Sequence, residues 1–168
     1  NSFGINGVVN SGQVGTYKAV FALAAALQSD GKIVVAGNAS DGNLSHPAVF
    51  RFLPSGQLDV SFNGTGYRVI KLSATAYPNA ISLQSDGKIL IGGEIRNTGN
   101  SDVFASRLTS SGLLDTGFGL NGIGTFDING RGDYCNGIVV SSAGNVFLTG
   151  RTLNDDFYSD IFLIKLNS

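Results

Sequence analysis

Hydrophobic residues in this chain come in short runs separated by glycine, serine, asparagine and aspartate. In residues 83–93 (LQSDGKILIGG) two aliphatic runs flank a Ser-Asp-Gly turn, which predicts a β-hairpin because Asp-Gly tolerates positive φ. Similar stretches occur 56 residues earlier, at 27–37 (LQSDGKIVVAG), and 57 residues later, at 140–150 (VSSAGNVFLTG). The chain is therefore one unit written three times.

Aligning the copies predicts repeats at 3–61, 62–117 and 118–168, within a single repeat domain over residues 1–168. Each repeat is expected to hold four strands. The first strands are predicted at 4–10, 63–70 and 119–126, and the second at 21–27, 77–83 and 134–140. The third strands are predicted at 32–37, 88–93 and 145–150, and the fourth at 49–53, 103–108 and 161–166.

The second strand of the first copy can be recognised only by comparison with the aligned copies. Residues 20–27 (VFALAAAL) have helical propensity when taken alone. Their counterparts YPNAISL and YCNGIVV are poor helix sequences, so all three are predicted as strands. A cation recurs in the fourth strand, at Arg51, Arg107 and Lys165, and is expected to face solvent or to brace a loop.

Four short strands in a unit of about 56 residues favour an all-β fold, a β-propeller built of four-stranded antiparallel blades. The alternative is a β-solenoid, whose coils are usually shorter than this unit. The alignment places the first strand of each repeat on the blade that the preceding repeat builds. The outer strand of each blade is thus contributed by the next repeat.

Three blades are too few to close a propeller, since rings hold about 4 to 8 blades. Either two chains form a homodimer with a six-bladed ring, exchanging residues 4–10, or the chain is part of a longer propeller. The sequence contains no Met and begins inside a motif, so we expect a processed or excised piece.

Two motifs recur together: the hairpin SDGKIVVAG, at 29–37, and a Ser-Gly-x-Leu-Asp turn, at 55–62 (SGQLDVSF) and 111–118 (SGLLDTGF). The pair resembles the delta-60 repeat family of bacterial proteins over nearly the whole chain. The resemblance implies a secreted or cell-surface location, a propeller fold and no established catalytic residue. The third copy departs from the motif, with Ala-Gly-Asn at 143–145 in place of Asp-Gly-Lys.

Composition argues against several function classes. The net charge is −1 and no run of Lys or Arg occurs, so nucleic acid is not an expected partner. The longest apolar run, residues 19–27, is too short to cross a bilayer, so membrane insertion is not expected. With one histidine, His46, and one cysteine, Cys135, no catalytic triad or histidine metal cluster can be assembled. We expect no enzyme activity.

Candidate binding residues lie where the copies differ. The repeated turns are expected to be scaffold at one end of the blades, and the loops at 38–47, 94–102, 151–160, 11–20, 72–76 and 127–133 to form a binding surface at the other. Predicted ligand-binding residues in or beside these loops are Tyr77, Asn79, Tyr134, Asn136 and Tyr158. An alternative for Tyr77 and Tyr134 is packing between blades, since they occupy one aligned position.

Calcium is the one cofactor that the sequence suggests, because Asp155, Asp156 and Asp160 form an acidic cluster of candidate ligands. Residues 127–133 (DINGRGD) match a calcium loop less well, because Ile138 stands where the closing glutamate belongs. The Arg-Gly-Asp tripeptide at 131–133, typical of integrin ligands, is expected in an exposed loop.

These features predict a non-catalytic extracellular or cell-surface module for protein interaction or adhesion. The expected partner is a protein or glycan at a cell surface. One alternative is a carbohydrate-binding lectin with pockets between blades, although the chain has no Trp for sugars to stack on. A second alternative is a structural spacer without a saturable ligand.

Overall fold

The computed structural model describes residues 3–12, 14–156 and 158–167. These residues form β-strands joined by turns, which confirms the all-β prediction. The strands are β1 (Ala19–Leu27), β2 (Ile33–Ser40), β3 (Ser45–Phe52), β4 (Tyr67–Val69), β5 (Thr75–Leu83), β6 (Ile89–Arg96), β7 (Ser101–Leu108), β8 (Ile123–Phe126), β9 (Asp133–Val140), β10 (Val146–Leu153) and β11 (Ser159–Leu166). Nothing in the described part of the chain is a helix long and apolar enough to cross a membrane.

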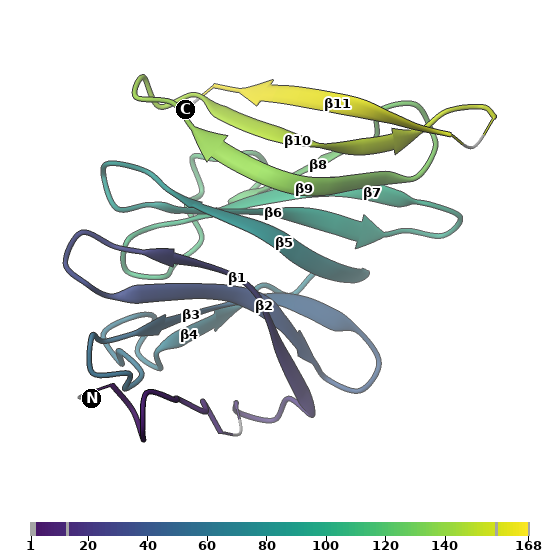
Figure 1. Ribbon diagram of the computed structural model, residues 1–168. Helices are drawn as coiled ribbons and strands as arrows, with labels where there is room; N and C mark the ends of the chain where they lie inside the picture. The colour runs from purple at the N-terminus through teal and green to yellow at the C-terminus, as the bar shows by residue number, and fades with distance from the viewer. Residues whose placement is uncertain (1–2, 13, 157, 168) are drawn as a thin grey trace.

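The strands form three antiparallel sheets: a first sheet of β1 to β4, a second of β5 to β8 and a third of β9 to β11 (Figure 1). Within each sheet, every strand pairs with the next one along the chain. The outer strands β4 and β8 belong to the next sequence repeat. The predicted permutation is therefore confirmed for the first two sheets.

The sheets are stacked face to face, with the first and third at opposite ends of the stack (Figure 1). Strand β5 contacts β1, β2 and β3 of the first sheet, and β9 contacts β5, β6 and β7 of the second. The first strand of each sheet therefore lies beside the first strand of the next. Each sheet buries one face, or both, against its neighbours.

A β-bulge interrupts the first strand of every sheet at the same place, at Leu23, Asn79 and Asn136. A glycine of the second strand lies opposite each bulge. A Cβ atom at Gly37, Gly93 or Gly150 would lie 1.9 Å from the carbonyl oxygen of Phe21, Tyr77 or Tyr134, respectively. The backbones approach so closely that only glycine fits, which explains why each hairpin motif ends in glycine.

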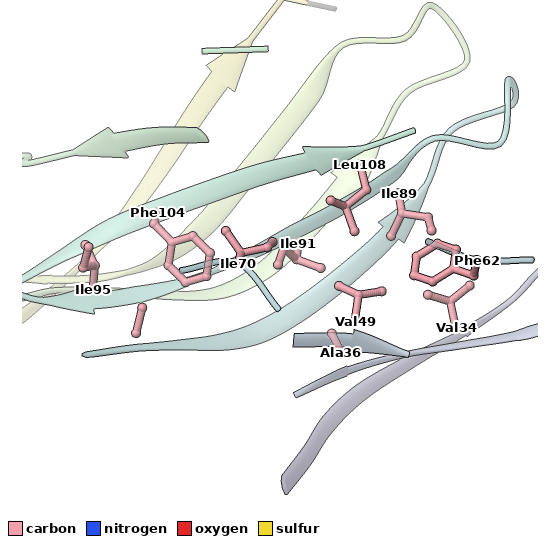
Figure 2. Packing of buried hydrophobic residues seen from close by; sticks show 11 residues of the cluster. Val34, Ala36, Val49, Phe62, Ile70, Ile89, Ile91, Ile95, Phe104 and Leu108 are labelled. Carbon is pink, nitrogen blue, oxygen red and sulfur yellow. The ribbon is translucent and has the colours of Figure 1, made fainter. Parts of the chain in front are cut away.

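Most of the core lies between the sheets, and a smaller cluster of Val14, Ala39, Ala48 and Phe50 lies on the outer face of the first sheet. One cluster joins the first and second sheets and includes Val49, Phe62, Ile91, Phe104 and Leu108, which point toward one another in Figure 2. A second cluster, between the second and third sheets, is built from Phe118, Cys135, Leu148, Phe162 and their neighbours. Burying one such large apolar side chain contributes roughly 1.5–3 kcal/mol, so these clusters hold the stack together.

Buried arginines brace the turns that follow β3 and β7. The Nε atoms of Arg51 and Arg107 each donate to a carboxylate oxygen at 2.8 Å, on Asp59 and Asp115. Arg51 also donates from Nη1 to the carbonyl oxygen of Ser110 at 2.6 Å, which ties the first sheet to the second. The loop-bracing prediction is confirmed for these two cations. Only Lys165, in the third copy, is exposed.

One predicted strand is wrong. Residues 4–10 form a turn closed by an isolated bridge between Ile5 and Val8, like the bridge between Leu120 and Ile123 ahead of β8. The equivalent segments β4 and β8 form strands because they pair with β3 and β7. Within the described residues, no strand pairs with residues 4–10, so their backbone has no ladder to join.

The predicted loops at one end are too long. Strands β1 and β2 stay paired as far as Ala19 and Ser40, and β5 and β6 as far as Thr75 and Arg96. Only 41–44, 97–100 and 154–158 remain as connections between second and third strands. The backbone ladder, rather than side-chain hydrophobicity, sets these strand ends. The predicted loops at 11–20 and 151–160 each include one residue, 13 and 157, outside the described residues.

Candidate functional site

The stack presents two different ends. At one end the three repeated hairpin turns, between β1 and β2, β5 and β6, and β9 and β10, surround one cleft of about 770 Å³. Its lining is mostly polar or small and includes Gln28, Gln84, Asp86, Ser141 and Gly144. The Oε1 atoms of Gln28 and Gln84 are buried without a hydrogen-bond partner among the described residues. We call this the turn end.

The opposite end carries residues 41–44, 97–100, 154–156 with 158, and 127–132, and we call it the variable-loop end. A polar pair closes each of the first three loops. The pairs are Asp41 with His46, Asn97 with Asp102, and Asn154 with Asp160. Hydrogen bonds from the amides of Leu44 and Asn43 lower the pKa of Asp41 to about 2, so it is an anion at neutral pH. The pair recurs, but its chemistry changes from copy to copy.

The predicted tyrosines lie at or near this end. Tyr77 and Tyr134 occupy equivalent places on β5 and β9, each with an arginine over its ring, Arg96 at 4.8 Å and Arg151 at 4.3 Å from the ring centroid. These guanidinium groups cover one face of each ring. Tyr158, in the connection to β11, is 72% exposed. The structure therefore brings no three of the predicted residues into one pocket among the residues it describes.

The two predicted asparagines are the bulged residues of β5 and β9. Asn79 donates from Nδ2 to the carbonyl oxygen of Cys135 at 3.1 Å and so links the second sheet to the third. Asn136 is exposed, and its side chain makes no hydrogen bond within the described part of the chain. Asn79 therefore has a structural role between sheets. No neighbouring sheet covers Asn136.

The predicted calcium ligands do not come together. Asp155 pairs with Arg131, whose Nη2 lies 2.9 Å from Oδ1, and Asp160 accepts a hydrogen bond from Asn154. Among the described residues, the acidic group with metal-binding spacing is instead Asp102, Asp127 and Asp133. Their carboxylate oxygens lie within 4.8 Å of one another. We call these three residues the aspartate cluster.

The environment of the aspartate cluster is unusual for surface carboxylates. Burial raises the pKa of Asp102 above its ordinary value, and the charges of Asp127 and Asp133 raise it further, against a hydrogen bond from Asn97. Asp133 is 0% exposed. The Arg-Gly-Asp tripeptide is therefore not available as a ligand in this structure, because its aspartate is buried, and the expectation of an exposed motif is wrong.

Sequence reasoning missed the aspartate cluster because its members lie in separate segments. Comparing copies could have found it. The positions of Asp102, Asp127 and Asp133 correspond to His46, Lys71 and Ala76 between the first and second sheets. All three change to aspartate at the second junction.

Neither His46 nor Cys135, the one histidine and the one cysteine of the chain, is placed to act as a general base or a nucleophile. The amide of Leu72 donates to Nδ1 of the buried His46, and Nε2 lies 3.4 Å from Asp41. Cys135 is buried, and burial raises the pKa of its thiol to about 11, far from the thiolate form at neutral pH.

Comparison with known proteins agrees with the repeat architecture. Residues 28–62 and 84–118 match a family model described as "Domain of unknown function (DUF5122) beta-propeller". Residues 121–158 match a second model, described as "Beta-propeller repeat" (SBBP). A search of curated proteins gives no match.

The matches support a β-propeller repeat family. They do not single out the delta-60 repeat family that the motifs resemble. Each DUF5122 match starts in a repeated hairpin turn and ends at the phenylalanine after the Leu-Asp turn, Phe62 or Phe118. Because the matched models are described as β-propeller repeats, we refer to the three antiparallel sheets as the first, second and third blade. The described chain is a stack of three blades with two free end faces (Figure 1).

Proposed function

We propose that this chain is a non-catalytic β-propeller module that binds a protein through its variable-loop end. The carrying observation is the contrast between the two ends. The turn end repeats the same hairpin in each copy, whereas the variable-loop end changes side chains and charge from blade to blade. A rigid scaffold that presents differing loops is a common way to build a specific binding surface.

The exposed residues of this end suit contact with a protein. Tyr158 is largely exposed, and the side chain of Arg96, stacked over Tyr77, is 58% exposed. Tyrosine and arginine are enriched at the energetically important centres of protein interfaces. A non-catalytic role is consistent with the engaged His46 and the buried Cys135.

A second part of the proposal is that two copies complete a six-bladed ring. On the outer face of the third blade, Ile161 and Leu163 are 88% and 69% exposed. Their equivalents in the second blade, Val103 and Ala105, are fully buried between blades. A fourth blade packed on the third would cover this face in the same way.

The first blade offers a matching surface. An apolar groove on its outer face is lined by Val35, Phe50 and Phe52 and by the segment that contains Val8 and Val9, beside a part of the same face where Val14 packs on Ala39, Ala48 and Phe50. The corresponding face of the second blade, with Ile91 and Leu108, is buried against the first blade. In a dimer the third blade of each copy would cover the first blade of the other. Residues 4–10 would then extend along β11 of the partner copy, as β4 pairs with β3.

A secreted or cell-surface location in a bacterium is also proposed, with adhesion as one role of such a module. It is supported by the resemblance of the two repeated motifs to the delta-60 repeat family.

The binding proposal is tested by retaining proteins on immobilised chain. The variants are a loop pair, Arg96→Ser with Tyr158→Ser, and a turn pair, Ser85→Ala with Ser142→Ala, each checked for an unchanged unfolding midpoint. We expect proteins held saturably by wild type and by the turn pair to be lost from the loop pair. Loss only from the turn pair would move the binding site to the cleft at the other end.

A glycan array separates the remaining alternatives. The lectin alternative requires glycan binding by wild type that disappears in Tyr77→Ala with Tyr134→Ala. We expect no such binding, because arginines cover one face of both rings. A chain that retains neither a protein nor a glycan would support the spacer alternative.

A further inference from the structure

The aspartate cluster joins the second and third blades at the variable-loop end. Asp102 is the second residue of β7, Asp127 directly follows β8, and Asp133 is the first residue of β9. Three separate segments therefore bring carboxylate oxygens within 4.8 Å of one another. None of the ion pairs formed by the described residues involves these aspartates.

Each aspartate uses one oxygen locally and leaves the other available. Asp102 accepts from the side-chain amide of Asn97 through Oδ2, Asp127 accepts from the amide of Gly130 at 2.6 Å through Oδ1, and Asp133 accepts from the amide of Ile128 at 2.8 Å through Oδ2. The Oδ1 atoms of Asp102 and Asp133 are buried with no hydrogen-bond partner in the described chain. Burying carboxylate oxygens without a partner is costly, and a cation bound between them would offset this cost.

The first junction between blades shows the contrast. Its equivalent residues are His46, Lys71 and Ala76, which offer one imidazole and no carboxylate. There the amide of Leu72 donates to His46, whereas the equivalent amide of Ile128 donates to Asp133. The first junction thus forms with the same backbone arrangement and without acidic groups. The three carboxylates are an addition to the second junction rather than a requirement of the fold.

We propose that the aspartate cluster binds a calcium ion that fastens the third blade to the second. The available donors are all oxygens, which favours a hard cation over zinc or copper. Calcium tolerates irregular geometry and can complete its shell with waters and backbone carbonyls, whereas magnesium demands a near-octahedral site. The ion would also hold residues 127–132, part of the variable-loop end, against β7. This inference is independent of the proposed binding of a protein partner.

The test titrates calcium chloride into chelator-treated chain, by calorimetry and by thermal unfolding. We expect saturable binding with a Kd on the order of 10⁻⁴ M, and an unfolding midpoint that rises with calcium concentration. In Asp127→Asn, binding should weaken by about tenfold or more, because one ligand charge is lost. Asp127→Lys, which installs the residue of the first junction, should abolish binding.

Asp155→Asn is the matched control, since it removes a carboxylate of another loop of the variable-loop end, outside the cluster, and it should bind calcium like wild type. Asp127 is chosen for substitution because it is exposed, so its variants are expected to fold. Absence of a calcium effect in wild type at millimolar concentration would overturn the proposal. So would equal binding by wild type and Asp127→Lys, or a response to magnesium without a response to calcium.

Discussion

The glycine opposite each β-bulge limits side-chain size at one position in every copy. In Gly93→Ala the new Cβ would lie 1.9 Å from the carbonyl oxygen of Tyr77, so β5 and β6 would have to move apart. We expect this substitution to lower the free energy of unfolding by roughly 3 kcal/mol, the cost of a severe clash in a packed region. Urea denaturation measures the change.

Gly117→Ala provides the control for this prediction. A Cβ at Gly117 would meet its nearest neighbour, Asp115 Oδ1, at 3.4 Å, which is an ordinary contact. The first copy already has a side chain here, since the equivalent residue is Ser61. Equal losses in Gly93→Ala and Gly117→Ala would contradict the account of the bulge.

The buried pair of Arg51 and Asp59 gives the fold a dependence on pH. Burial raises the pKa of Asp59, but hydrogen bonds from Ser61 and the charge of Arg51 outweigh burial and leave it below its ordinary value. A depressed pKa means that the folded state binds the proton less readily than the unfolded state. The stabilisation is therefore complete above about pH 4, the unfolded pKa, and is lost as the pH falls through the folded pKa.

Asp59→Asn tests this linkage. At neutral pH we expect a loss of roughly 3 kcal/mol, because the buried guanidinium loses its counter-charge. Below pH 4 the unfolding midpoints of variant and wild type should converge. Asp156→Asn, an exposed aspartate with no ion pair in the described chain, should follow the wild-type profile. A constant difference between Asp59→Asn and wild type at all pH values would rule out the linkage.

At the level of single residues, sequence could predict only part of the site. The alignment predicts one shared position for Tyr77 and Tyr134, and the structure shows them at equivalent places beneath arginines, while their ligand-binding role stays a prediction. Asp155, Asp156 and Asp160 were grouped because they are close in sequence, yet the strand ends spread them apart. Asp102, Asp127 and Asp133 meet only through the packing of β7, β8 and β9. Contacts of that kind depend on blade geometry, which no local pattern contains.

Among the elements, the bulged strands β5 and β9 make a direct test possible. Asn79→Ala removes the hydrogen bond to Cys135 across the blade junction, and we expect it to cost about 1 kcal/mol of unfolding free energy. Asn136 occupies the same place on β9 but has no next blade to reach. Asn136→Ala should have no effect on an isolated chain.

Asn136→Ala also tests whether two chains close a ring. In the proposed dimer, Asn136 would donate to the carbonyl oxygen of Ala22 of the partner subunit, the counterpart of Cys135. Asn136→Ala should then weaken the dimer, measured by its dissociation on dilution. A dimer that the substitution leaves unchanged would contradict the proposed register of the closed ring.

Two segments, β1 and residues 4–10, show how far the sequence could predict the elements. The helix-prone run of β1 was correctly predicted as a strand, because its aligned copies in β5 and β9 are poor helix sequences. Residues 4–10 were predicted as a strand by the same alignment, and that was wrong. Aligned sequence shows what a segment can form. A strand also needs a partner, and within the described chain residues 4–10 have no strand to pair with.

At the scale of the whole molecule, three repeats leave the outer faces of the first and third blades without a neighbouring blade. The third blade exposes apolar residues whose counterparts are buried, and the first blade has an apolar groove on the opposite face. The unpaired edge of β11 adds backbone groups ready to pair with another strand. In the proposed ring, a second copy would satisfy all three features at once.

The mass of the chain in solution, measured by light scattering at several concentrations, tests this central claim most directly. We expect twice the chain mass of 17.4 kDa, the mass of a six-bladed ring formed by two copies. A folded species that stays at 17.4 kDa at all concentrations would contradict the account, because the exposed faces of the first and third blades would then be stable without a partner.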